Sequence, residues 1–228
     1  MRLDLIRHAE PDYARDDLTS AGRLEAQALA QRYAASPPTH LYVSSLGRAR
    51  ATAQHLARAT GLVPVEDPLL DELDWHVEDA TWGRLSAWDL PGERVRAAPS
   101  QGVPPAFGAG VAALHAHGDA LLARHGMRRD GARYAITRRS DEHIAVVGHG
   151  GVTLTWLPHL LDLPVDRFWC GFWLPPSSVT TLVFEEHSDA WATPRCTALA
   201  DVSHLVAAGL PTSPSGRHGR GHAGPEPA

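Results

Sequence analysis

The stretch "LIRHAEP", residues 5–11, is an apolar run that ends abruptly on an arginine, a histidine and an acid. Together with the apolar residues before it, this run predicts a short buried strand over residues 2–6. Two interpretations of Arg7 and His8 follow. Either the strand has simply reached the surface, or its end carries a nucleophile beside an arginine that binds phosphate. The rest of the chain distinguishes between them.

Two further apolar runs end in the same way. "HIAVVGHGG", residues 143–151, predicts a strand that stops on His149 between glycines. "HLYVSS", residues 40–45, predicts a strand that is followed by a helix with Arg48 in its first turn. Because strands alternate with helices, we expect an α/β fold, a three-layer α/β/α sandwich with a mostly parallel central sheet. Ligands of such sheets bind beyond the carboxyl ends of the strands, so the polar residues at these ends should share one crevice.

The composition excludes several classes of function. All 21 basic residues are arginine, so the chain has neither the lysine of a P-loop nor a lysine that could form a Schiff base. The net charge of −5 argues against nonspecific binding of nucleic acid. Neither the two cysteines, Cys170 and Cys196, nor the histidines show the spacing of metal ligands. We therefore expect no metal and no other cofactor.

The sequence also gives no sign of a membrane segment. It contains no apolar run of the roughly 18 residues that a membrane helix needs. Its N-terminus lacks the basic segment followed by an apolar one that is typical of a signal peptide. We therefore expect a cytoplasmic protein that does not bind membranes.

The predicted crevice suits the chemistry of a phosphoryl group. Such a group carries negative charge on several oxygens, and the planar guanidinium of arginine donates two hydrogen bonds to oxygens of this kind. A neutral imidazole such as that of His8 can attack phosphorus and hold the group covalently. A carboxylic acid near the crevice can protonate the departing alkoxide. The acidic stretch "LLDELDW", residues 69–75, supplies candidates around Glu72.

Three segments, "LIRHAE", "SSLGRARATA" and "VVGHGG", resemble in order and spacing the motifs of the histidine phosphatase superfamily, also called the phosphoglycerate mutase-like family. The resemblance spans residues 3 to about 186. It implies a phosphoglycerate mutase-like sandwich in which His8 is the phosphorylated nucleophile. It also implies a phosphate pocket made of Arg7, Arg48 and His149.

Members of this family often carry their proton donor at the position that Glu72 occupies here. The glycine, tryptophan, glutamate and glycine run that usually follows is absent, and "DWHVEDATWG", residues 74–83, stands in its place. Other carboxylates within local reach are therefore alternatives to Glu72, namely Asp71, Asp74, Glu78 and Asp79.

The chain divides into a domain and a tail. Residues 1–207 are predicted to form the histidine phosphatase domain, and residues 208–228, rich in Pro, Gly, Ser, His and Arg, are predicted to be a disordered tail. Within the domain, residues 76–106 predict an irregular excursion that faces the substrate. Trp82 and Arg84 in this excursion are candidate substrate-binding residues, because an indole stacks on rings and a guanidinium binds anions.

The short segment after the nucleophile favours hydrolysis. Only "PDYARDD", residues 11–17, separates Glu10 from the next predicted helix, which resembles the phosphatase branch of the family. We expect a phosphatase that hydrolyses a phosphate monoester of a small metabolite through a phosphohistidine intermediate. The alternatives are a phosphoglycerate mutase-type phosphotransferase, a phosphohistidine protein phosphatase, and a non-catalytic module that binds phosphoryl ligands. The aromatic stretch over residues 156–176 is compatible with a homodimer.

Overall fold

The fold is built on an eight-stranded mixed sheet. The computed structural model describes residues 1–80, 83–100 and 102–217. In spatial order the strands are β5 (Val65–Glu66), β4 (His40–Val43), β10 (His143–Gly148), β1 (Arg2–Arg7), β11 (Val179–Glu186), β12 (Trp191–Asp201), β9 (Arg133–Ile136) and β8 (Met127–Asp130).

The two halves of this sheet differ in strand direction. β5, β4, β10 and β1 pair in parallel, as the sequence predicts. From β1 onward, each pairing through β11, β12, β9 and β8 is antiparallel. The central sheet is therefore mixed, and the expected parallel sheet makes up one half of it. The strands whose carboxyl ends carry Arg7, Arg48 and His149 all belong to the parallel half.

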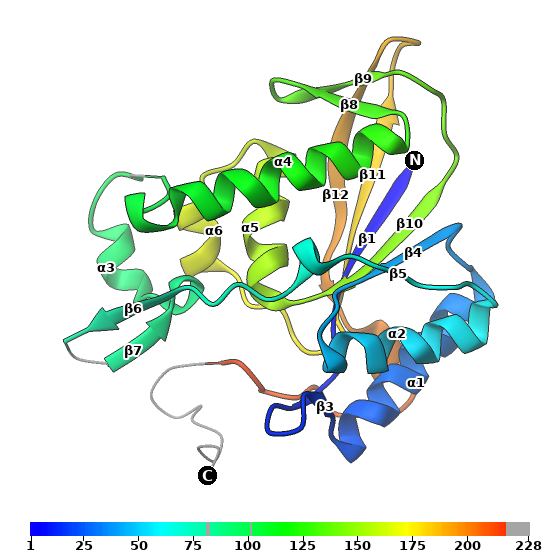
Figure 1. Cartoon of the computed structure of the whole chain (residues 1–228), viewed down its shortest axis with the longest axis horizontal. Helices are drawn as coiled ribbons and strands as arrows, with labels where there is room; N and C mark the ends of the chain where they lie inside the picture. The colour runs from blue at the N-terminus through cyan, green and yellow to red at the C-terminus, as the bar shows by residue number, and fades with distance from the viewer. Residues whose placement is uncertain (81–82, 101, 218–228) are drawn as a thin grey trace.

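Helices cover both faces of the sheet, which confirms the three-layer sandwich (Figure 1). Leu3 and Leu5 of β1 point into the core that the sheet shares with the helices on one side, whereas Ile6 points into the core on the other side. This alternation follows from the two-residue period of a strand. The helices on the Leu3 side are α4 (Gly108–Arg124), α5 (Gly150–Leu161) and α6 (Val165–Gly171), and those on the Ile6 side are α1 (Ser20–Ala35) and α2 (Gly47–Thr60).

Local signals in the sequence explain where the first two helices begin and end. The hydroxyl of Thr19 caps α1 by accepting a hydrogen bond from the backbone N–H of Gly22 at 2.9 Å. Gly61 ends α2 with a left-handed backbone angle φ of 75°, which a residue without a Cβ adopts easily.

Residues 76–106 form short elements beside α6. They comprise the hairpin of β6 (His76–Asp79) and β7 (Gly83–Ser86), two 3₁₀ turns, η2 (Ala87–Asp89) and η3 (Pro105–Phe107), and α3 (Gly92–Arg96). The smaller remaining elements are η1 (Pro68–Leu70), α7 (Ser203–Ala207) and the two-residue strands β2 (Pro11–Asp12) and β3 (Asp17–Leu18).

Residues 208–217 lie in the predicted tail, and the structure places them against the folded domain. Ser213 is buried, and the carbonyl of Ser215 accepts a hydrogen bond from Arg7. The polar composition of this segment hid these contacts, because they are made largely by backbone atoms. Residues 218–228 of the predicted tail lie outside the described residues. Within the described part of the chain, no helix has the length and apolarity needed to cross a membrane.

Candidate active site

The predicted reactive residues meet at the carboxyl edge of the parallel strands. His8 follows β1, and its backbone N–H donates to the carbonyl of Gly148, the last residue of β10. His149 comes next in the chain, and the centroid of its ring lies 5.1 Å from that of His8. Arg48 reaches the same point from the first turn of α2, with its Nε 3.3 Å from Nε2 of His8. The fold therefore brings together the residues that the three sequence motifs single out.

Hydrogen bonding sets the tautomer of His8. Its Nδ1 lies 2.8 Å from the carbonyl oxygen of Ala9. A carbonyl oxygen only accepts, so Nδ1 carries the proton and Nε2 keeps its lone pair. The imidazole is 2% exposed, and Nε2 faces the guanidinium of Arg48. This is the geometry of an oriented nucleophile.

The surroundings also keep the His8 imidazole neutral. Burial is the largest cause, and the positive charges of Arg7 and Arg48 and the neighbouring His149 act in the same direction. Together they hold the pKa of His8 well below its ordinary value of 6.5. An unprotonated Nε2 is therefore present at neutral pH.

Arg7, the last residue of β1, has an unused donor. Its Nη1 donates to the carbonyl of Leu174 at 2.5 Å and to that of Ser215 at 3.3 Å. Its Nε is buried and has no hydrogen-bond partner in the described part of the chain. A buried N–H without a partner costs about 1–3 kcal/mol. An anion in the site would satisfy this donor.

Arg48 is fixed from behind by Asp16. Nη1 of Arg48 donates to Oδ1 of Asp16 at 2.6 Å, while the backbone N–H of Gly47 donates to Oδ2 at 2.6 Å. Burial opposes ionisation of Asp16, but these hydrogen bonds outweigh it and lower the pKa of that carboxyl. Asp16 adopts a left-handed backbone with φ of 48°, which is uncommon for a residue other than glycine. The strain is compatible with a loop shaped to aim Arg48.

His149 ends a hydrogen-bonded chain that begins at Asp71. The Ser44 hydroxyl donates to Oδ1 of Asp71 at 2.7 Å, so it must accept from Nε2–H of His149, also at 2.7 Å. Nδ1 of His149 is then left without a proton, and it is buried with no hydrogen-bond partner among the described residues. Burial, followed by the charges of Arg48 and Arg7, holds the pKa of His149 well below 6.5. A phosphate dianion would favour a proton on Nδ1, which could then donate to it.

Glu72 lies at the N-terminus of α5. Its carboxylate accepts from the backbone N–H groups of Leu73, Gly151 and Val152 at 3.1–3.3 Å. Burial nevertheless raises the pKa of Glu72 above its ordinary value. A Cβ at position 151 would lie 2.6 Å from the Trp88 ring and 2.7 Å from the Glu72 carboxylate, so only glycine allows both groups to approach the helix. Glu72 is thereby held beside an indole that limits water around it.

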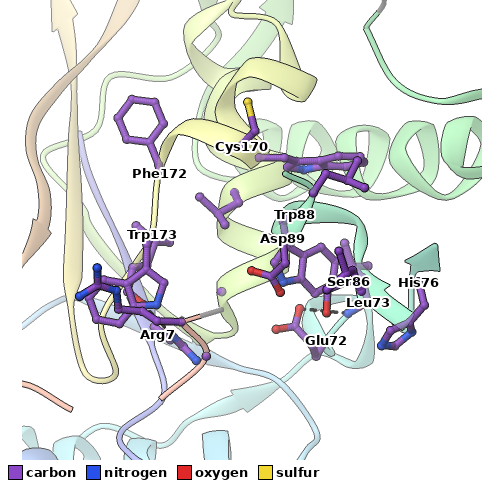
Figure 2. A pocket seen from close by; sticks show the side chains of 18 of the residues that line it. Arg7, Glu72, Leu73, His76, Ser86, Trp88, Asp89, Cys170, Phe172 and Trp173 are labelled. Carbon is purple, nitrogen blue, oxygen red and sulfur yellow. Dashed lines mark hydrogen bonds between the residues drawn. The ribbon is translucent and has the colours of Figure 1, made fainter. Parts of the chain in front are cut away.

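Arg7 and Glu72 line a cleft of about 920 Å³. Figure 2 shows Arg7 and Trp173 on one side of it, and Glu72, Leu73 and Ser86 on the other. Arg48 also lines the cleft, whereas His8 and His149 are buried next to lining residues. The volume is at the upper end of the range for small-molecule sites.

The other candidates take different positions. Asp71 accepts hydrogen bonds from the hydroxyls of Ser44 and Ser45 and from the backbone N–H of Ser45, at 2.6–2.7 Å. Asp74 is exposed at the cleft rim, where it pairs with His76 and Arg84. Arg84 itself does not line the cleft, and Glu78 is exposed on the β6–β7 hairpin. Trp82 and the side chain of Asp79 lie outside the described residues.

One group of potential metal ligands occurs among the described residues, at the opposite edge of the sheet. It consists of His40, His125 and Glu142. Both ring nitrogens of His125 are already engaged, with the Tyr42 hydroxyl at 2.8 Å and with Glu142 at 2.7 Å. This group is remote from His8 and does not contribute to the cleft.

Sequence reasoning missed several supporting residues. Ser44 and Asp16 position His149 and Arg48, and the segment 172–174 with residues 216–217 forms part of the cleft wall. The sequence contained a signal that could have indicated Ser44 as a candidate, since this residue places a hydroxyl at the carboxyl end of a parallel strand. Asp16 and residues 216–217 gave none, because their contacts join segments distant in sequence.

Comparison with known proteins agrees with this geometry. A family profile described as "Histidine phosphatase superfamily (branch 1)" matches residues 3–197. The chain is 35% identical over 82 residues to "Probable phosphoglycerate mutase GpmB" of Serratia proteamaculans (strain 568), a match that spans 32% of this chain and 38% of that protein. It is 28% identical over 179 residues to the glucosyl-3-phosphoglycerate phosphatase of Mycobacterium tuberculosis (strain ATCC 25618 / H37Rv), covering 73% of this chain and 78% of that protein.

Solved structures share the fold. The mycobacterial glucosyl-3-phosphoglycerate phosphatase superposes with a TM-score of 0.60 at 24% identity, over 87% of this chain and 98% of that one. A phosphoserine phosphatase from Entamoeba histolytica, in complex with 3-phosphoglyceric acid, has a TM-score of 0.62 at 22% identity, over 90% of this chain and 98% of that one. These similarities show the same α/β architecture.

Proposed function

Because the chain belongs to the histidine phosphatase superfamily, we propose that it hydrolyses a phosphate monoester of a small metabolite through a phosphohistidine intermediate on His8. One observation carries this proposal. The His8 imidazole is buried and neutral, with Nδ1–H bound to a carbonyl and the Nε2 lone pair beside the Arg48 guanidinium. Such an imidazole is ready to attack an anion that the arginine holds.

Three residues bind the phosphate. Arg48 and the free Nε–H of Arg7 donate to its oxygens, and Nδ1 of His149 donates once it has taken up a proton. Their combined positive charge meets the charge that spreads over the equatorial oxygens in the transition state. Asp16 and Ser44 keep two of these donors aimed at the cleft.

Phosphoryl transfer to the enzyme is the first chemical step. Nε2 of His8 uses its lone pair to form a bond to phosphorus, in line with the ester oxygen. The bond between phosphorus and that oxygen breaks, and its electron pair stays on the leaving oxygen. Protonated Glu72 gives its proton to this oxygen, so a neutral alcohol departs.

Water completes the cycle in the second step. The Glu72 carboxylate takes a proton from water as the water oxygen bonds to phosphorus. The bond between phosphorus and Nε2 breaks, its electron pair returns to His8, and inorganic phosphate leaves. Both the nucleophile and the protonated acid are then restored.

Release of inorganic phosphate from 4-nitrophenyl phosphate tests the proposal. We expect turnover in the wild type at mildly acidic and neutral pH, and none above background in His8→Ala. A protein labelled with ³²P should carry the label at an acid-labile, base-stable bond, which is the behaviour of phosphohistidine. His55→Ala, which changes a half-buried histidine of α2 that does not line the cleft, serves as the matched control. Turnover retained in clean, folded His8→Ala would refute this function.

Phosphoryl transfer is the second candidate, because several of the similar proteins are named as probable phosphoglycerate mutases. A mutase would move phosphate between hydroxyls of 3-phosphoglycerate without releasing it. Product analysis by ³¹P NMR separates the two reactions. Binding of phosphate without either reaction would indicate a non-catalytic module, and release from phosphohistidine in a protein would indicate a protein phosphatase.

Two further properties belong to the same proposal. We expect the protein in the cytoplasm, which cell fractionation tests. A homodimer through the aromatic stretch at 156–176 is tested by analytical ultracentrifugation.

A further inference from the structure

The cleft has two chemically different ends. Arg7 and Arg48 make one end strongly positive. Beyond Glu72 the lining is mostly apolar and includes Leu73, Trp88, Leu90, Leu154, Trp169 and Phe172. The phosphate fits the first end, so the second end must receive the alcohol part of the substrate.

Acidic groups accompany this apolar lining. Asp74, Asp89 and Glu93 contribute carboxylates. Asp74 pairs with His76 and Arg84, whereas Glu93 forms no ion pair within the part of the chain that the structure describes. The arginines of the excursion, Arg84, Arg94 and Arg96, are not among the lining residues, although Arg84 pairs with Asp74 and a Cβ on Gly171 would lie 3.1 Å from Nη2 of Arg96. A second anion on the substrate would therefore meet the carboxylate of Glu93 at this end.

Arg217, the third arginine that lines the cleft among the described residues, lies with the phosphate end. Arg217 places its guanidinium 5.1 Å from the ring centroid of Trp173. Its neighbour Gly216 contacts the Arg7 guanidinium, and a Cβ there would lie 2.7 Å from Nη2 of Arg7. Arg217 thus adds to the charge around the phosphate and does not compensate the acids near Glu93.

The geometry points to a substrate whose leaving group is an apolar, ring-bearing alcohol without a second anionic group. This inference rests on the proposed phosphatase function and narrows its substrate class. It separates this chain from the relatives named for glucosyl-3-phosphoglycerate and phosphoserine, whose names describe substrates that carry a carboxylate.

The position of Trp88 supports this class of leaving group. The indole lies against Gly151 and beside the Glu72 carboxylate. A ring attached to the leaving oxygen would lie on the indole while that oxygen faces Glu72, and aromatic pairs favour such contact. Phe172, the residue that follows α6, is 41% exposed and offers a second aromatic surface.

Two matched pairs of substrates test the inference through kcat/KM. Glycerol 3-phosphate and 3-phosphoglycerate differ by a hydroxymethyl group against a carboxylate. Phenyl phosphate and 1-naphthyl phosphate differ by one apolar ring. We expect at least tenfold preference for the neutral member of the first pair and for the larger member of the second, the size of effect that about 1.4 kcal/mol gives.

Substitutions of lining residues test whether the lining causes these substrate preferences. Glu93→Gln should reduce the preference against the carboxylate severalfold. Phe172→Ala should reduce the naphthyl preference about threefold to tenfold, the range of one aromatic contact. Asp130→Asn, an exposed acid on β8 that does not line the cleft, should alter neither preference.

The outcomes are distinguishable. A higher kcat/KM for 3-phosphoglycerate than for glycerol 3-phosphate, or for phenyl than for naphthyl phosphate, would overturn the inference while leaving the phosphatase function intact. Unchanged preferences in both Glu93→Gln and Phe172→Ala would also overturn it. Absence of phosphate release from every one of these esters would overturn the phosphatase function, and the inference with it.

Discussion

The phosphate end of the cleft and its apolar wall are built in different ways. The phosphate end consists of residues that directly follow strands of one parallel sheet, so backbone hydrogen bonds between β1 and β10 fix their relative positions. The wall combines residues 73–93, the segment 169–174 and residues 216–217. These segments are distant from one another in the sequence, and none of them belongs to the eight-stranded sheet.

Because of this difference, we expect the phosphate end to determine catalysis and the wall to determine which substrate is preferred. At the phosphate end a shift of one residue in the register of β10 against β1 would displace His149 from His8, so the sheet strongly restricts change. The wall is made of loops and short elements, which tolerate substitution more readily. Substitutions at the first end should therefore lower activity on every substrate, whereas substitutions in the wall should change which substrate is preferred.

Arg48→Ala should give the largest effect after loss of the nucleophile itself. Removing this guanidinium eliminates a charge-assisted donor in a water-poor site, and we expect kcat/KM to fall on the order of 10³-fold for all the esters alike. Steady-state kinetics on 4-nitrophenyl, phenyl and 1-naphthyl phosphate measure this loss. Arg133→Ala, which removes an arginine stacked on Trp191 away from the cleft, is the control. A loss confined to one ester would contradict the division between the two ends.

Glu72→Gln should give the next largest effect, and its size should depend on the leaving group. An alkoxide needs a proton on departure, so we expect glycerol 3-phosphate turnover to fall roughly 10²-fold or more. The stable 4-nitrophenolate should lose far less. Burial raises the pKa of Glu72, so wild-type kcat should be present below this pKa and decline as the pH rises through it. Glu72→Gln should lack that decline, and Asp74→Asn should retain it; the reverse would assign the acid to Asp74.

The difference between the phosphate end and the wall also explains which site residues the sequence could predict. His8, Arg48 and His149 each follow an apolar run within a residue or a few, so a local pattern places them at a strand end. The topology of parallel sheets then brings the ends together. The core positions of β1 and the cap at Thr19 were equally local.

The antiparallel half and the wall gave weaker signals. β12, over Trp191–Asp201, has few large apolar residues and is half exposed along its length, so it lacks the contrast of a buried strand. Residues 208–217 have the composition of a tail, yet Ser215 binds Arg7 through a carbonyl that any residue possesses. Because every residue has a backbone carbonyl, contacts made by the backbone cannot be predicted from residue type. Ser44 and Asp16 became visible only when the loops were placed side by side.

A buried acid beside the segment that follows His8 lowers the stability of the fold at neutral pH. Glu25 of α1 is buried, and its carboxylate accepts from the backbone N–H of Glu10 at 2.8 Å. Burial, with the charge of Glu10, raises the pKa of Glu25 to about 7. The folded state therefore binds a proton that the unfolded state releases above about pH 4.5.

Stability should then fall as the pH rises from about 4.5 to about 7, by on the order of 2–3 kcal/mol for this group. Urea unfolding of wild type and Glu25→Gln at pH 5 and pH 8 measures the difference. The variant should gain stability relative to the wild type at pH 8. Glu66→Gln, an exposed acid on β5, should show no such change with pH. A constant difference between wild type and Glu25→Gln would contradict the assignment.

Ser44→Ala gives the smallest of these effects and tests how finely the phosphate end is positioned. Without the hydroxyl, Nε2–H of His149 is buried and unpaired, so the ring can turn or exchange its proton to Nδ1. We expect kcat/KM to fall about tenfold for all esters, the effect of one lost neutral hydrogen bond, and inorganic phosphate to inhibit more weakly. Ser45→Ala is a close control, because Ser45 also donates to Asp71 but does not contact His149. If both variants lose activity equally, Asp71 acts through the shape of its loop; if only Ser44→Ala does, the chain from Asp71 to His149 orients the imidazole.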